Sequence, residues 1–128
     1  LASGHLARAT WNCDSKRSVT DATMRNKYDA ARAEDEPIIA RVSEVAHAHG
    51  VPMSQVALAW LWARGVESPI VGCSKPSRVD NAVDALDIHL SKEEIDYLEE
   101  LYHAHELVGP KSRPGEKPLA GTTKVKLK

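Results

Sequence analysis

The sequence predicts an α/β chain that is mostly helical as it stands, with one short strand at about residues 69–72. Three observations lead to this prediction. Apolar residues recur at helical spacing in several segments. Residues typical of helix ends frame these segments, such as Gly50 after the first and Ser91 before the last. Finally, "PIV" at 69–71 is short, apolar and β-branched, which favours a buried strand.

The length and composition indicate one globular domain. The chain has 128 residues, of which 42% are hydrophobic and 27% charged, enough for a core of its own. No window approaches the roughly 18 continuous apolar residues of a membrane span. Cys13 and Cys73 lie far apart and form no C-x-x-C pair, which suits a reducing compartment, so we expect a cytoplasmic protein. Because the chain starts at Leu1 and not at Met, we expect it to be a piece of something longer.

Charge is distributed unevenly although the net charge is only −1. Residues 1–110 are acidic, which argues against a broad nucleic-acid surface. The end of the chain is basic and rich in Pro and Gly; its cations are Lys111, Arg113, Lys117, Lys124, Lys126 and Lys128, against Glu116 alone. We therefore expect residues 1–110 to form the domain and residues 111–128 a disordered tail.

Four helices are expected. The first runs from about Asp35, with Pro37 in its first turn, to Gly50. The second, 53–64, is apolar almost all round and should be buried between other elements. The third helix starts at about Pro76, and its predicted buried stripe is Val79, Ala82, Val83 and Leu86. The fourth follows a capping box of Ser91 and Glu94, and its predicted buried stripe is Ile95, Leu98, Leu101 and Tyr102. Residues before about Glu34 show no apolar period and indicate a long loop.

The stretch "SPIVGCSKPSRVDNAVDAL", 68–86, has the order of a strand, a small-residue turn and a helix start. The first amides of a helix lack intrahelical acceptors and favour an anion. Lys75 and Arg78 lie one helical turn apart, so both could approach one phosphate. The alternative is a plain connection capped by Ser74, with both cations in solvent. The segment alone leaves the two interpretations open, because it lacks the spacing of a known phosphate-binding loop.

Other chemistry is less well supported. His47 and His49 point away from each other on a helix, and His103 and His105 lack an obvious third ligand, so no metal site is predicted. The segment 41–64 has the order of a DNA-binding helix-turn-helix, but its second helix offers "ALAWLW" where base-reading polar side chains would be needed. The tryptophans there are better explained as core residues than as base-stacking platforms.

Three blocks of the sequence together resemble the C-terminal part of an aldo-keto reductase. They are "LASGHLAR", "GVPMSQVALAWLWARGVESPIVGCSKPSRVDNAVDALDIHLSKEEIDYLEELY" and "HELVG". The branch they resemble most is that of the NADP-dependent aryl-alcohol dehydrogenases and versiconal-reductase-like enzymes. The resemblance implies a fragment of a (β/α)8 barrel, whose cofactor lies at the C-terminal ends of the strands.

The resemblance also implies a cofactor site for NADP(H). It makes "PIVGCS" the eighth strand and its exit, and it makes the helix from Pro76 the one whose start binds the adenosine 2′-phosphate. The implied phosphate contacts are Cys73, Ser74, Lys75 and Arg78, and Asn81 would lie near the adenine. Leu1, Gly4 and Leu6 would line the pyrophosphate. Arg17 would lie in a loop over the cofactor. Ala82 departs from the Asn of several branches, which removes one adenine contact.

The resemblance places the family's catalytic Asp, Tyr, Lys and His outside this chain, so no catalytic or metal-binding residue is assigned here. Two functions from different classes remain. The first is a part of an NADPH-dependent carbonyl reductase acting on a small-molecule aldehyde or ketone, with no nucleic-acid or membrane partner. The alternative is a non-catalytic helical binding module or truncated remnant. The substrate and the oligomeric state are not predicted.

Overall fold

The computed structural model describes residues 1–11 and 28–104. Within these ranges all regular secondary structure is helical. In chain order they are the 3-10 helices η1 (Ala2–Ala7) and η2 (Asp29–Ala31), the α-helices α3 (Arg32–His49), α4 (Met53–Ala63) and α5 (Pro76–Asp84), the 3-10 helix η3 (Ala85–Asp87) and α6 (Lys92–Glu99). No described helix is long and apolar enough to cross a membrane.

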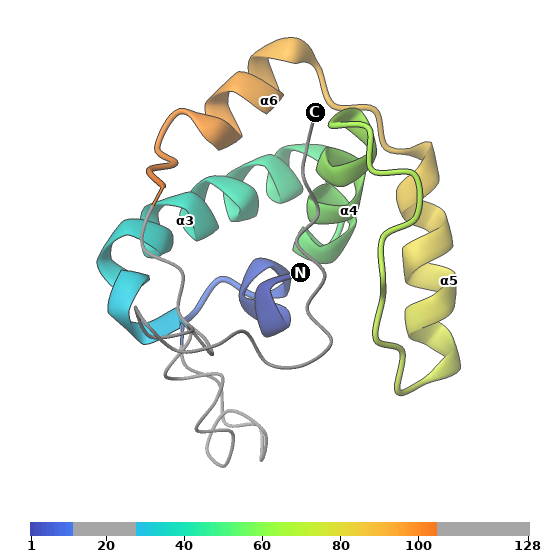
Figure 1. Ribbon diagram of the computed structural model, residues 1–128. Helices are drawn as coiled ribbons and strands as arrows, with labels where there is room; N and C mark the ends of the chain where they lie inside the picture. Colours follow the sequence, from blue (N-terminus) through green and yellow to red (C-terminus); the bar gives the residue numbers. More distant parts are fainter. Residues whose placement is uncertain (12–27, 105–128) are drawn as a thin grey trace, which may run out of the picture.

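Helix α4 is the centre of this arrangement. It packs against α3, α5, η1 and η3, while α3 also packs against α6 (Figure 1). Its middle residues, Gln55 to Ala59, are all buried, as predicted from a sequence that is apolar almost all round. The only polar side chain among them, that of Gln55, donates a 3.0 Å hydrogen bond from Nε2 to the backbone oxygen of Asn81 on α5.

Helix α3 starts three residues before the predicted Asp35 and contains Pro37 inside the helix. Glu34 and Asp35 lie in its first turn, where acidic side chains interact favourably with the helix dipole. Gly50 ends it in the left-handed conformation, with φ 67°. The Gly50 amide donates to the His47 oxygen at 3.1 Å and the Val51 amide to the Ala46 oxygen at 3.0 Å, the pattern of a Schellman cap. The chain turns there directly into α4.

The capping box predicted at the start of α6 is confirmed. The Glu94 amide donates to Ser91 Oγ at 3.2 Å, and the Ser91 amide donates to Glu94 Oε2 at 2.8 Å. Of the predicted stripe on this helix only Leu98 is buried, and Tyr102 is exposed. Helix α6 therefore meets the core through one large side chain.

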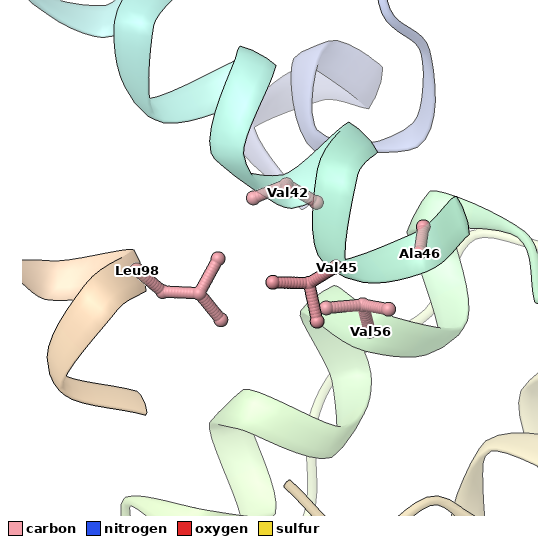
Figure 2. Close-up of a cluster of buried hydrophobic side chains, with 5 residues drawn as sticks. All are labelled: Val42, Val45, Ala46, Val56 and Leu98. Carbon is pink, nitrogen blue, oxygen red and sulfur yellow. The ribbon is translucent and has the colours of Figure 1, made fainter. Parts of the chain in front are cut away.

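The core lies where α3, α4 and α6 meet. Figure 2 shows its buried cluster, Val42, Val45 and Ala46 of α3, Val56 of α4 and Leu98 of α6. Half-buried apolar residues surround it, among them Leu6, Val51, Met53, Trp60 and Leu90. Since Leu6 belongs to η1, the start of the chain is attached to this core.

The predicted strand at 69–72 is wrong for the described part of the chain. Residues 69–73 adopt no regular secondary structure, and Ile70 is 98% exposed. A strand needs a neighbouring strand for its backbone hydrogen bonds, and the described residues provide none. The predicted burial of Val79, Val83 and Leu86 is also wrong. Helices α5 and η3 pack on α4 through their other side and leave these three side chains exposed. The predicted tail, 111–128, lies outside the described residues.

Candidate functional site

The connection from Gly72 into α5 is the best candidate for an anion site. Residues 72–78 are all exposed. Lys75 precedes the helix in an extended conformation, with φ −143° and ψ 146°, and no side chain caps the helix start. The Ser74 hydroxyl therefore does not cap α5, in contrast to the alternative interpretation of this segment. Pro76 has no amide hydrogen, and the Arg78 amide donates to the Lys75 oxygen at 3.0 Å.

The charges around this helix start favour an anion. Lys75 and Arg78 lie three residues apart, so both side chains can approach the same point beside the helix start. Neither forms an ion pair with another residue of the described part of the chain, and the first turn of α5 contains no acidic residue. An ammonium, a guanidinium and the hydroxyls of Ser74 and Ser77 are a donor set that suits a phosphate.

Asn81 is held by the neighbouring helix. Its Oδ1 accepts a 3.0 Å hydrogen bond from Ser54 Oγ, and its backbone oxygen accepts one from Gln55. The side chain is half-buried between α4 and α5. Its oxygen therefore serves the packing of these helices, and the amide NH2 is the group left for a polar contact to a ligand.

The predicted residues near the start of the chain lie on a different element. Leu1, Gly4 and Leu6 belong to η1 or precede it, and the Gly4 amide donates to the Leu1 oxygen at 2.9 Å. Gly4 has φ 96°, a conformation that favours glycine. η1 packs on α3 and α4, whereas α5 packs on α4 and η3. Five of the predicted site residues therefore lie together, on the connection before α5 or on α5 itself: Cys73, Ser74, Lys75, Arg78 and Asn81. The η1 residues lie on a separate element. Arg17 lies outside the described residues.

A separate cavity of about 740 Å³ opens between η1, α3, α4 and α6. Apolar and aromatic side chains form most of its lining, including Trp11, Ile39, Val42, Trp60 and Leu98. None of the residues 72–78 lines it. The cavity is therefore distinct from the candidate anion site.

His5 lines this cavity, and no motif in the sequence singles it out. It is buried, its ring centroid lies 4.3 Å from that of Trp11 and 5.2 Å from that of Tyr28, and neither ring nitrogen has a hydrogen-bond partner among the described residues. Burial and the nearby Arg8 cation lower the pKa of His5 below its ordinary value of 6.5. Burial therefore favours the neutral form of this ring.

No group of acidic, histidine or cysteine side chains suited to a metal exists among the described residues. His47 and His49 are exposed, and His49 Nε2 lies 2.6 Å from Glu94 Oε1. The helix-turn-helix alternative is not supported, because the middle of α4, which would have to enter a groove, is buried.

Comparison with known proteins identifies related sequences. The profile of the Aldo/keto reductase family matches residues 1–103. An aldo-keto reductase of Alternaria alternata is 41% identical over 85% of this chain, and the versiconal hemiacetal acetate reductase of Aspergillus parasiticus is 42% identical over 80%. A Saccharomyces cerevisiae protein named for aryl-alcohol dehydrogenase activity is 38% identical over 79%.

The matched segment is a minor part of these relatives. This chain covers 29%, 30% and 29% of their respective lengths. No solved structure matches the chain significantly.

Proposed function

The chain belongs to the aldo/keto reductase family, and on this premise we propose that it is part of an NADPH-dependent reductase of aldehydes and ketones. Within that enzyme, we propose that the start of α5 binds the adenosine 2′-phosphate. Family membership supports an oxidoreductase with a nicotinamide cofactor in a (β/α)8 barrel. Beyond this, we propose that the enzyme prefers NADPH to NADH.

One observation carries this preference, namely the two exposed cations at a helix start that no side chain caps. NADPH differs from NADH by a 2′-phosphate, which a helix N-terminus and two cations can bind with charge-assisted hydrogen bonds. A bare 2′-hydroxyl accepts no comparable interaction. Lys75 and Arg78 would hold the phosphate, with Cys73 and Ser74 beside it and the amide of Asn81 toward the adenine.

The cofactor, when bound, supplies a hydride to the carbonyl carbon. The proposed role of this chain is to bind and orient the adenosine end. Fixing that end positions the reactive ring and removes the entropic cost of finding the correct geometry. The proposed enzyme acts in the cytoplasm, where an exposed thiol such as that of Cys73 stays reduced.

A graft tests the phosphate assignment in a complete enzyme. Residues 69–86 would replace the corresponding segment of the Aspergillus parasiticus reductase, and the dissociation constants of NADPH and NADH would be measured before and after Lys75→Ala and Arg78→Ala. A charge-assisted hydrogen bond contributes about 1.5–3 kcal/mol, so the double variant should bind NADPH roughly a hundredfold more weakly. NADH binding should change little.

Lys92→Ala, introduced with residues 87–99 grafted in the same way, is the matched control. Lys92 is another exposed cation near a helix start, and it pairs with Asp96. Equal losses of NADPH and NADH affinity on replacing Lys75 and Arg78 would show that they support the fold and do not bind the phosphate.

A further inference from the structure

The hydroxyl of Ser54 on α4 is bonded to a residue of the candidate cofactor site. Ser54 lies in the first turn of α4, and its Oγ donates a 3.0 Å hydrogen bond to Oδ1 of Asn81 on α5. No side chain caps α4, so this hydroxyl is not used at its own helix start. Helices α4 and α5 pack against each other (Figure 1). The bond therefore connects the start of α4 to the middle of α5.

This hydrogen bond orients the side-chain amide of Asn81. The amide carries an oxygen that accepts hydrogen bonds and an NH2 group that donates them. Because the oxygen is directed at Ser54, the NH2 group is directed away from it. No described residue accepts a hydrogen bond from this NH2 group, and Asn81 is only half-buried. Its N–H donors are therefore available to a ligand.

A second hydrogen bond from α4 separates the orientation of Asn81 from the packing of the helices. Gln55 Nε2 donates to the backbone oxygen of Asn81 at 3.0 Å. This bond holds the backbone of α5 against α4 whichever way the Asn81 side chain is turned. The bond from Ser54 acts on the side chain alone. We therefore expect it to set the direction of the amide more than the contact between the two helices.

Asn81 lies beside the proposed phosphate contacts. It follows Arg78 by three residues on α5, and residues at this spacing are neighbours on a helix surface. A nucleotide whose 2′-phosphate lies at the helix start can therefore place its base beside Asn81. Ring nitrogens of adenine accept hydrogen bonds, so an NH2 group held in one direction suits this base.

We propose that Ser54 is a positioning residue for the cofactor, which holds the Asn81 amide so that its NH2 group donates to a ring nitrogen of the adenine. This inference rests on the proposed NADPH site at the start of α5. An amide that is already oriented loses less conformational freedom on binding than one that must first be turned. The Ser54 hydroxyl should therefore strengthen the binding of the base and leave that of the phosphate unchanged.

The affinities of two ligands for a complete enzyme test the proposal. Residues 1–103 would replace the matched segment of the Aspergillus parasiticus reductase. Calorimetry would give the dissociation constants of adenosine 2′,5′-bisphosphate and of the same sugar bisphosphate with a methoxy group in place of the base. Ser54→Ala should weaken the first roughly three- to tenfold, the net effect of one hydrogen bond, and leave the second unchanged. Ser54→Thr keeps the hydroxyl and should restore the affinity.

A double-mutant cycle shows whether Ser54 acts through Asn81. Asn81→Ala should weaken adenosine 2′,5′-bisphosphate at least as much as Ser54→Ala does, and adding Ser54→Ala to it should cause no further loss. Ser43→Ala, at a half-buried position on α3, is the matched control and should change neither affinity. Additive losses would overturn the proposal. So would an equal loss for both ligands on Ser54→Ala, because Ser54 would then only support the fold.

Lys75→Ala and Arg78→Ala distinguish this inference from the proposed phosphate site. Both ligands carry the 2′-phosphate, so these substitutions should weaken both. Unchanged affinities would refute the phosphate site, whereas the role of Ser54 is decided by the difference between the two ligands. If the chimaera does not fold, NMR of the isotope-labelled full chain provides a second measurement. The Asn81 NH2 signals should shift with the adenosine compound and not with the base-free one, and no shift would overturn the proposal.

Discussion

The carboxylate of Glu99 on α6 accepts a 2.7 Å hydrogen bond from the indole Nε1 of Trp60 on α4. The same carboxylate pairs with the guanidinium of Arg64, just after α4. Through these contacts the Glu99 side chain joins α6 to the C-terminal end of α4. In the buried core cluster, α6 contributes only Leu98. The bond from Arg64, followed by that from Trp60, lowers the pKa of Glu99 below its ordinary value of 4.5.

Glu99→Gln is expected to make stability less dependent on pH in acid. Because the folded pKa of Glu99 is lowered, its contribution is fully present above about pH 4.5 and is lost as the pH falls through the folded pKa. Gln keeps an acceptor for Trp60 but cannot titrate. Urea unfolding between pH 3 and 7 measures this, and Glu67→Gln, at an exposed loop position, is the control. Parallel pH curves for the variant and the unchanged chain would contradict the role assigned to Glu99.

His5→Phe is expected to stabilise the chain, and more so in mild acid. The buried His5 ring has two nitrogens without partners among the described residues, and such groups cost about 1–3 kcal/mol each when unsatisfied. Since its folded pKa is lowered, stability is highest above pH 6.5 and falls as the pH drops through 6.5 toward the folded value. Thermal unfolding at pH 5 and pH 8 should show this loss in the unchanged chain and not in the variant. His47→Phe, at an exposed position, should leave the loss in place.

Leu98→Ala is expected to lower the free energy of unfolding by about 2–3 kcal/mol, because it removes a core side chain and leaves a cavity. Val79→Ala, on the exposed side of α5, should change it by less than about 0.5 kcal/mol. Equilibrium unfolding in urea provides both values. Similar values for the two variants would mean that α6 is not anchored through Leu98.

The isolated chain is expected to reduce no carbonyl compound. This prediction rests on the resemblance that places the family's catalytic residues outside the chain, because loss of both the acid and the cofactor orientation removes many orders of magnitude in rate. Oxidation of NADPH with 4-nitrobenzaldehyde would be followed by absorbance, with the complete Aspergillus parasiticus reductase as the active control. Turnover above the buffer rate would show that the chain contains catalytic groups of its own.

Features that form within a few residues could be predicted from the sequence. The capping box of Ser91 and Glu94 and the stop at Gly50 depend on side chains and torsions next to one another in the chain, and both are confirmed. The central position of α4 followed from its apolar composition. The family, too, was identified correctly, because the order of several blocks is more specific than any one motif.

Features that depend on a distant partner could not be predicted in this way. The pattern of Val79, Val83 and Leu86 shows which side of α5 and η3 is apolar, but burial requires another surface, and α4 covers the opposite side. The same applies to the strand expected at 69–72. His5 carries no local signal, since its burial comes from Trp11 and Tyr28. The cofactor contacts taken from the family resemblance stay predictions.

Gly50 occupies a turn between α3 and α4 that accepts few other residues. A Cβ there would meet no atom within 4 Å, so space is not the restriction. The restriction is the backbone, because φ 67° costs an ordinary L-residue roughly 1–2 kcal/mol. This torsion also sets the direction in which α4 leaves α3, and hence how Val45 and Ala46 meet Val56. Position 50 therefore tolerates glycine best, and asparagine or aspartate at some loss.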